Sequence, residues 1–469
     1  MPCTNRLTTL LAAGLLAGAA HAAPLTAEQQ KLRSIYQELV EINTTNSVGS
    51  CTVAATAMAA RLKAGGYADS DLQIVIPPGG PKKGNLVARL KGSGAKKPLL
   101  FLAHIDVVEA NPADWVRDPF KLVEENGEFY ARGSRDDKSM AAVFVANMIR
   151  YKQEHLKLNR DLIMALTCDE ELATSPFDGA NYLARHHRDL IDAELAINEG
   201  GSGLLGDDGK PLRLGFLAGE KLPQSFDLVV TNKGGHSALP TPDNAITQLS
   251  DGLGRLGKFA FPFRLTDTTR TFFERMSQIE KGQVAADMQA ILKTPPDAAA
   301  MDRLYAASPF YNGSVRTTCV PTMIDGGLAD NALPQRAHAL VNCRILPGES
   351  VAQTQATLTR VLADPQIAVT PIGIAEAAPP TPVNHELMAA VESIGAAMWP
   401  GVPVVPTMVT GATDGRHLNA VGIWTYGVNG MFSTGDGGGM HGINEHMRVQ
   451  ALYEGQEFLY RLGKKLGGL

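Results

Sequence analysis

In the first half of the chain, short apolar runs alternate with longer stretches in which apolar residues recur at helical spacing. The runs typical of buried strands are 85–92, 97–108, 161–168 and 193–201, and the helical stretches are 29–42, 51–66 and 139–153. Near the C-terminus a helical stretch at 384–399 precedes a further strand-like run at 422–430. This alternation predicts an α/β fold built on a mixed, mostly parallel sheet flanked by helices.

The pattern changes between Pro223 and Gly373. Strands are expected at 225–233, 312–320, 336–346 and 367–371, and helices at 244–256 and 351–363. Within this region the segment from Phe263 to Ala307 is polar, unusually long and mostly helical in pattern. We therefore expect an α+β unit inserted between two parts of the α/β sheet.

The boundaries follow from these changes and from the N-terminal segment. Arg6, an apolar run and the small residues around His21 are typical of a cleavable secretory signal. A short membrane anchor is the alternative, but the run is shorter than the ~20 residues that a spanning helix needs. We expect a signal peptide at 1–22, a first catalytic part at 23–222, the insertion at 223–376, and a second catalytic part at 377–469.

Composition narrows the function classes. Of the 469 residues, 44% are hydrophobic and 19% are charged, and the formal net charge is −5. Because there is no basic excess, we expect neither nucleic acid nor an anionic membrane as a partner. Export would place the chain in the periplasm or outside the cell, where disulfides are stable. The mature chain keeps four cysteines, whose pairing the sequence leaves open: Cys51, Cys168, Cys319 and Cys343.

His and carboxylate residues gather where the predicted strands end. His104 and Asp106 stand two apart, so their side chains point to one side of the strand. The other strand ends and turns supply further candidates: Asp136, Asp137, Asp169, Glu170, Glu171, Glu199 and His441. Each signal alone is weak, since acidic turns are usually solvated. Together they point to one edge of the sheet, where ligands bind in parallel α/β folds.

Carboxylates that share a site repel one another unless cations balance them. Imidazole and carboxylate ligands without cysteine are typical of a catalytic zinc site with an open position. We therefore expect two Zn²⁺ per subunit, for which Co²⁺ or Mn²⁺ could substitute at the same ligands.

Five segments, in chain order, carry a resemblance to a known family. "HIDVV", "ARGSRDDK", "CDEE", "NEGG" and "HGINE" resemble the metal-site motifs of the co-catalytic zinc exopeptidases and deacylases. This family includes glutamate carboxypeptidase, succinyl-diaminopimelate desuccinylase, aminoacylase and carboxypeptidase S. The resemblance extends from about Ala27 to the C-terminus, and "DVVEANPADWVRDPF" is most similar to the carboxypeptidase S branch. It implies the zinc exopeptidase fold with an inserted lid or dimerisation domain.

The resemblance also implies a role for each matching residue. Asp136 would bridge the two metals, with His104 and Glu199 completing one site and Glu171 and His441 the other. Glu170 matches the general acid/base. Asp106 matches the carboxylate that orients the ligand imidazole, a role that the usual surroundings of metal-bound histidines favour independently.

Candidate substrate-binding residues come from the insertion and from a later loop. "GGHSALP" resembles the family motif whose His reaches an active site, here His236, in its own or the partner subunit. Asn331 and Arg344 match an Asn and an Arg thirteen positions later, and Arg344 suits a substrate carboxylate. A salt bridge within the lid is the alternative role for Arg344. The loop "GATDGRHL" adds Thr413, Asp414 and Arg416.

These residues predict a dinuclear zinc hydrolase that cleaves an amide bond beside a free C-terminal carboxylate in peptides. An N-acyl amino acid deacylase is the first alternative, and an inactive peptide-binding homologue is the second. The resemblance further suggests a homodimer formed through the inserted domain.

Overall fold

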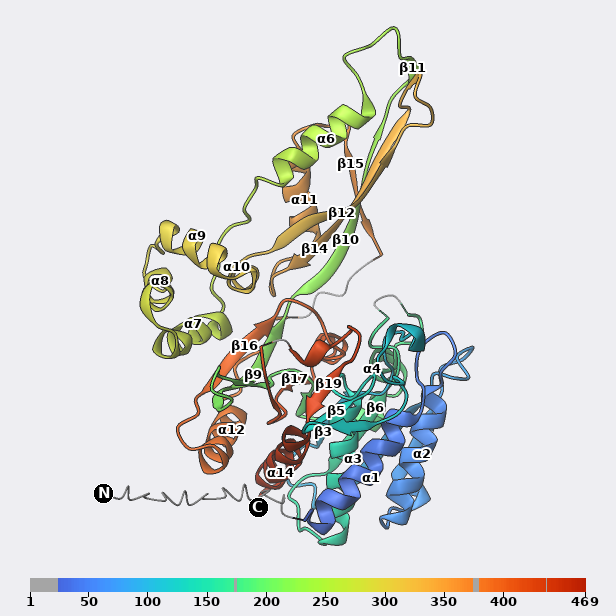
Figure 1. Ribbon diagram of the computed structural model, residues 1–469, viewed down its shortest axis with the longest axis vertical. Helices are drawn as coiled ribbons and strands as arrows, with labels where there is room; N and C mark the ends of the chain where they lie inside the picture. Colours follow the sequence, from blue (N-terminus) through green and yellow to red (C-terminus); the bar gives the residue numbers. More distant parts are fainter. Residues whose placement is uncertain (1–23, 173–174, 374–378, 436) are drawn as a thin grey trace, which may run out of the picture.

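A computed structural model describes residues 24–172, 175–373, 379–435 and 437–469. The predicted signal segment, 1–22, lies outside these ranges. Figure 1 shows a large sheet with its helices at one end of the molecule and a smaller sheet at the other. Within the described ranges, no helix has both the length and the apolar character needed to cross a bilayer.

The large sheet has ten strands, and its centre is parallel, as predicted. β3 (Leu99–His104) lies between β6 (Leu162–Thr167) and β7 (Leu195–Asn198), and β17 (Trp424–Gly427) pairs with β7 in the same direction. The outer strands are β1 (Leu72–Val75), β2 (Asn85–Leu90), β8 (Gly203–Leu205), β9 (Pro211–Glu220), β16 (Val404–Val409) and β18 (Phe432–Ser433). Antiparallel pairs such as β2 with β6 make the sheet mixed.

Helices cover both faces of this sheet, and every residue of β3, β6 and β7 is therefore buried. Along β3, Phe101 packs on one face and Leu100 on the other. One face is covered by α1 (Ala27–Glu41), α2 (Cys51–Ala64), α3 (Lys138–Gln153), α12 (His385–Met398) and α14 (Val449–Leu466). The other is covered by α4 (Gly179–His186), α5 (Arg188–Ile191) and α13 (Gly415–Ala420).

The inserted sheet has its own core. Its four strands follow the order β12 (Thr318–Gly326), β14 (Arg336–Ile345), β10 (Leu222–Thr231) and β15 (Ala368–Ile372), all antiparallel. Alternate residues of β10 and β14 pack under α6 (Ala245–Leu256) and α11 (Val351–Leu362). At its far end β11 (Gly235–His236) pairs with β13 (Ala332–Leu333) (Figure 1).

Four helices stand beside the inserted sheet (Figure 1): α7 (Asp267–Ile279), α8 (Gly282–Ile291), α9 (Ala298–Ala307) and α10 (Pro309–Val315). Their buried core includes Val405 of β16, so they pack against the large sheet's edge. The strand predicted at 312–320 is wrong in its first part, because α10 extends to Val315 and β12 begins only at Thr318. Ser308 caps this short helix and Pro309 starts it, which favours helix over strand.

Two disulfides resolve the cysteine pairing that the sequence left open. Cys51, at the start of α2, is bonded to Cys168, directly after β6. Cys319 and Cys343 face each other on β12 and β14 and are also bonded. Each bond joins segments that are already neighbours in the fold.

Candidate metal centre

His104 is the last residue of β3, and its imidazole is almost fully buried. Its Nδ1 lies 3.1 Å from the backbone oxygen of Asp106, and its Nε2 lies 3.0 Å from Oδ1 of Asp136. Contact between Nδ1 and a carbonyl fixes the ring orientation, as is usual for histidines that bind metals. The imidazole is therefore presented toward Asp136.

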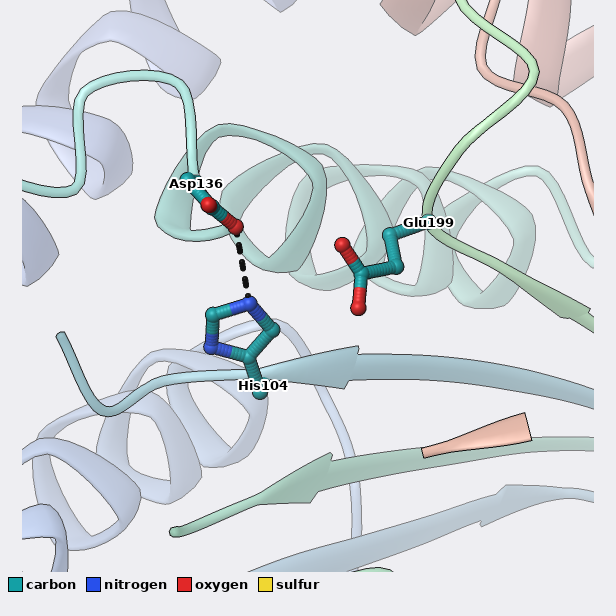
Figure 2. A group of neighbouring side chains, drawn as sticks. All are labelled: His104, Asp136 and Glu199. Atoms are coloured by element: carbon teal, nitrogen blue, oxygen red, sulfur yellow. Dashed lines mark hydrogen bonds and ion pairs between the residues drawn. The ribbon is translucent and has the colours of Figure 1, made fainter. Parts of the chain in front are cut away.

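Asp136 stands between two histidines. Its Oδ2 lies 3.1 Å from Nε2 of His441, and that same nitrogen is 3.0 Å from Oε2 of Glu171. Figure 2 shows Asp136 and Glu199 directed toward His104 from two other segments of the chain. The donor atoms of His104, Asp136 and Glu199 lie within 4.8 Å of one another, as do those of Asp136, Glu171 and His441. The structure thus assembles all five predicted ligands into two groups that share Asp136.

Asp106 has a second contact that the sequence did not suggest. Its Oδ1 accepts a hydrogen bond from the backbone N–H of Glu170 at 3.2 Å, and its Oδ2 accepts one from Glu171 at 3.1 Å. The Asp106 carboxylate lies 3.6 Å from Nδ1 of His104, whereas the backbone oxygen of Asp106 lies 3.1 Å from the same nitrogen. Asp106 therefore joins the imidazole of His104 to the turn that carries Glu170 and Glu171.

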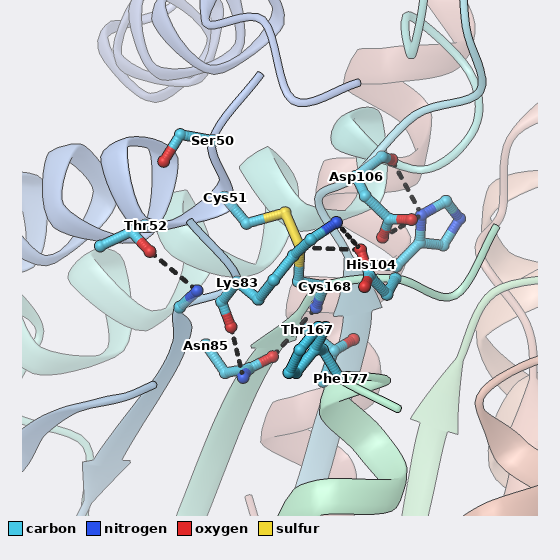
Figure 3. The surroundings of a disulfide bond; sticks show 12 residues. Ser50, Cys51, Thr52, Lys83, Asn85, His104, Asp106, Thr167, Cys168 and Phe177 are labelled. Carbon is cyan, nitrogen blue, oxygen red and sulfur yellow. Dashed lines mark hydrogen bonds and ion pairs between the residues drawn. A yellow bond between two sulfur atoms is a disulfide. The ribbon is translucent and has the colours of Figure 1, made fainter. Parts of the chain in front are cut away.

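That turn is held from several sides (Figure 3). The disulfide fastens Cys168, two residues before Glu170, to the first residue of α2. Asp169 forms an ion pair with Lys83 at 2.6 Å and accepts a hydrogen bond from Ser175. Because these contacts converge on one short turn, Glu170 and Glu171 are placed with little freedom to move.

Glu445 is a positioning residue that the sequence analysis missed. Its Oε1 accepts hydrogen bonds from the backbone N–H groups of Arg135 at 2.8 Å and Asp136 at 3.1 Å. Its Oε2 accepts from the backbone of Gly133 and from the guanidinium of Arg132. Antiparallel pairing of β5 (Glu128–Tyr130) with β19 (His446–Arg448) brings Glu445 beside this loop. The sequence signal was its place at the end of "HGINE", where only His441 had been singled out.

The electrostatics of the cluster reflect a surplus of partly buried carboxylates. Burial raises the pKa of Glu170 and of Glu199 well above the ordinary value, and neighbouring carboxylates raise both further. Burial acts in the same direction on Asp136, but hydrogen bonds with His104 and His441 outweigh it and lower the pKa. Hydrogen bonds with Asp136 and Glu171 raise the pKa of His441 to about 10.

These residues fit two divalent cations. Each group offers one imidazole nitrogen and carboxylate oxygens, a donor set that zinc accepts, and the shared Asp136 can serve both. The partly buried carboxylates repel one another in the protein alone, and positive charge between them would remove that repulsion. The donor chemistry and the charge balance thus agree.

Thr413 and Asp414 lie close to this centre. Thr413 lines the same cavity as Asp136 and Glu199, and its backbone and hydroxyl both donate to Glu220. Asp414 is buried and accepts a hydrogen bond from Thr167 at the end of β6. Thr413 is therefore within the candidate site, and Asp414 supports the strand beneath it.

Arg344 and Arg416 lie at the junction of the two sheets. Arg416 lines a hollow together with Glu220 and Lys221, which connect β9 to β10. The pKa of Arg344 is lowered by burial and by the charge of Arg416. Among the described residues, no carboxylate forms an ion pair with Arg344. The salt bridge considered as an alternative role for Arg344 is absent from this part of the structure.

His236 and Asn331 are not brought to the metal centre of their own chain. His236 is exposed on β11, and the backbone N–H of Ser237 donates to the carbonyl of Asn331. Figure 1 shows β11 at the end of the inserted sheet farthest from β3. The two residues are neighbours at the tip of the insertion.

Comparison with known proteins identifies the family. The family model "Peptidase family M20/M25/M40" matches residues 100–465. The chain belongs to this peptidase family. It is 27% identical over 387 residues to the N-fatty-acyl-amino acid synthase/hydrolase PM20D1 of Mus musculus, covering 78% of this chain and 73% of the relative. It is 26% identical over 395 residues to the probable carboxypeptidase S-like 2 of Dictyostelium discoideum, covering 81% and 74%.

A solved structure shares the fold. The M20 family metallo-carboxypeptidase Sso-CP2 from Sulfolobus solfataricus superposes with a TM-score of 0.67 at 18% identity, covering 95% of this chain and 100% of that one. The predicted α/β fold with an insertion and the predicted relation to carboxypeptidase S are therefore confirmed. The chain is a metal-dependent hydrolase of this family.

Proposed function

We propose that this enzyme hydrolyses the amide bond next to a free C-terminal carboxylate in peptides, as a carboxypeptidase or dipeptidase with two Zn²⁺ per subunit. The observation that carries the proposal is the pair of donor groups sharing Asp136, with Glu170 directly beside the candidate ligand Glu171. A protein that only binds peptides would have no need of an acid/base at this position. The carboxypeptidase names among relatives and solved structures support the same reaction class.

Five side chains would hold the metals: His104, Asp136, Glu171, Glu199 and His441. Bound metals would supply Lewis acidity to the scissile carbonyl and lower the pKa of water at the site. Co²⁺ or Mn²⁺ would suit the same ligands.

Glu170 would act as the general acid/base. It is partly buried, and this burial raises its pKa, so its carboxyl group holds a proton more readily than a fully exposed glutamate does. It would accept a proton from the attacking water and return it to the leaving amine. The backbone N–H groups of Glu170 and Glu171 both donate to Asp106, which would hold the acid/base and the adjacent ligand in fixed positions relative to each other.

Arg344 and Arg416 would receive the substrate's carboxylate. Among the described residues Arg344 has no carboxylate partner, and its pKa is lowered by burial and by Arg416. An anion placed between the two guanidinium groups would relieve this repulsion and could bind in a bidentate manner. Substrates with a free C-terminus would then be preferred over amidated ones.

The relatives named N-fatty-acyl-amino acid synthase/hydrolase favour a second candidate, the deacylation of N-acyl amino acids. The chemistry is the same, because the scissile bond is again an amide beside a free carboxylate. The two candidates differ only in the group attached to the carbonyl.

We also propose a homodimer formed through the inserted sheet, in the periplasm or outside the cell. β12 is an edge strand with large exposed apolar side chains, among them Val320, Met323 and Ile324. An edge of this kind is prone to pair with another chain. A second subunit docked there would allow exposed His236 to work in its partner's site. The two disulfides support an oxidising compartment.

The proposal is tested by assaying the zinc-loaded mature protein on dipeptides, longer peptides and N-acyl amino acids, each with its C-amidated counterpart, with and without a chelator. We expect chelator-sensitive release only from substrates with a free carboxylate. Equal cleavage of amidated substrates would contradict the role of Arg344. No cleavage of any substrate, with two metals verified as bound, would favour the inactive peptide-binding homologue.

A further inference from the structure

A cavity of about 370 Å³ opens directly beside the metal centre. Its lining includes Asp136, Asp137 and Glu199, so the cavity reaches the place where the scissile bond would lie. Its volume falls within the range of small-molecule pockets. A substrate held at the metal centre would have one of its two halves in this space.

The rest of the lining is mainly apolar and rich in methionine. Its large apolar members are Leu217, Phe310, Met408, Val409, Met431, Met440 and Met447. Methionine is unbranched and flexible, so such a wall adapts to extended apolar groups of different lengths. The lining also holds charged residues: Arg135 donates to Ser433, whereas burial lowers the pKa of Arg213, and the Arg213 Nε has no hydrogen-bond partner among the described residues.

Two elements build the walls. On β9 the side chains of Arg213 and Leu217 face the cavity, while Leu214 and Phe216 between them point into the core. Phe310, the second residue of α10, also lines the cavity. Its ring packs edge-on against Phe272 of α7 at 5.7 Å between centroids, which fixes the outer wall to the helices that pack on β16.

The cavity is separate from the hollow that holds Arg416. Glu220 lines that hollow and Thr413 lines the cavity, and the two are joined by two hydrogen bonds of 2.7 and 2.8 Å. If the carboxylate of the substrate occupies the arginine side, the acyl half must occupy the apolar side.

We propose that the α7–α10 segment supplies the outer wall of an acyl-group pocket through Phe310, and that this pocket selects substrates with an unbranched apolar group on the carbonyl side of the scissile amide. This inference rests on the proposed function and deepens it. The inference gives the long helical segment between Phe263 and Ala307 a role, because Phe272 in that segment packs against Phe310, the residue proposed to determine specificity.

The experiment measures kcat/KM of the zinc-loaded protein for one amino acid carrying acetyl, butyryl, hexanoyl, octanoyl, pivaloyl or succinyl groups. We expect kcat/KM to rise about fourfold per methylene buried in the pocket. Pivaloyl, which is branched, and succinyl, which is charged, should be poor substrates. Dipeptides with N-terminal Met, Ala or Glu extend the comparison and should rank in that order.

Phe310→Ala should lower the octanoyl-to-acetyl ratio of kcat/KM about fivefold while the acetyl rate changes little. Tyr305→Ala is the matched control, because Tyr305 is an exposed aromatic of α9 that lines a different hollow. Phe310→Trp keeps an aromatic ring against Phe272 and should also lower the octanoyl rate, by narrowing the pocket. It provides a second test if Phe310→Ala does not fold.

Three results would overturn the inference. A flat acyl series with chelator-sensitive cleavage of the acetyl substrate would leave the proposed function intact and remove the apolar pocket. A preference for succinyl or glutamyl substrates would show that the pocket recognises charge through Arg213. An unchanged ratio in both Phe310 variants would remove the role of α10. Absence of chelator-sensitive cleavage from every substrate would instead refute the proposed function, and the inference with it.

Discussion

The carboxylate of Glu445 accepts a hydrogen bond from the backbone N–H of Asp136 at 3.1 Å. Glu445 is fully buried, and the same carboxylate also accepts from the backbones of Gly133 and Arg135. The residue that would bridge the two metals is thus held by an acid more than three hundred positions later in the chain. Contacts of this kind orient ligands without touching the metal.

Glu445→Gln should therefore weaken metal binding. The amide replaces one acceptor oxygen with a donor, which cannot accept from the backbone N–H groups that the carboxylate now satisfies. We expect metal affinity to fall by about 10- to 100-fold. Titration of the metal-free protein with zinc and a competing chelator measures this. Glu386→Gln, at an exposed side chain, is the control and should bind like the wild type.

Glu170→Gln tests the acid/base role directly. Glutamine has nearly the same shape but cannot carry the proton, so kcat should fall by about 10²- to 10⁴-fold. Metal content should stay at the wild-type level, because Glu170 belongs to neither donor group. Steady-state kinetics together with metal analysis gives both values. Near-normal turnover with metals bound would contradict the proposed mechanism.

Removal of the Cys51–Cys168 disulfide should destabilise the protein and loosen the turn that carries Glu170 and Glu171. The bond closes a loop with a sequence separation of 117 residues, so the double alanine variant should lose about 5 kcal/mol of unfolding free energy. The Cys319–Cys343 pair closes a separation of 24 residues and should contribute about 3 kcal/mol. Urea denaturation compares the two. Only the first pair borders Glu170, so only its removal should also lower kcat.

His338 should make stability depend on pH. Hydrogen bonds to Asp227 on β10 and Asp325 on β12 raise its pKa above the ordinary value near 6.5. The folded state therefore binds this proton more tightly, and the stabilisation is complete below the unfolded pKa and is lost as pH rises through the folded pKa. The loss of stability in His338→Gln should be larger at pH 6 than at pH 9, as measured by urea denaturation. His155→Gln, at an exposed site, should show no such difference.

Ile324→Glu should disrupt the proposed dimer. Ile324 lies on the edge strand β12 with 60% of its surface exposed, and a charge there opposes pairing with another chain. Light scattering after size exclusion should give a dimer for the wild type and a monomer for the variant. Ile372→Glu, on the opposite edge strand β15, is the matched control. A monomeric wild type would contradict the proposal.

Much of the candidate site could be read from local patterns. Each predicted ligand stands at or just after the end of an apolar strand, or just before a helix. Parallel strands end at one edge of a sheet. The alternation of strands and helices therefore already predicts that His104 and Glu199 lie close together. The motif order then added Asp136, Glu171 and His441, and the structure brings the five together.

Other features depend on contacts between distant segments, which no local pattern encodes. Pairing of β5 with β19 places Glu445 against the loop of Asp136. Packing of α7 on β16 brings Phe310 into the lining of the cavity that also contains Asp136 and Glu199, although the sequence had assigned these helices to the insertion alone. The antiparallel course of the inserted sheet carries His236 to its tip.

The sequence by itself determined the fold class, the family and the residues available to bind metal, because periodicity and motifs are properties of neighbouring positions. Only the tertiary structure decided the cysteine pairs, the acid that positions Asp136, and the apolar wall beside the catalytic centre. These features arise from side chains that meet across the fold, where burial and packing between distant segments select the partners.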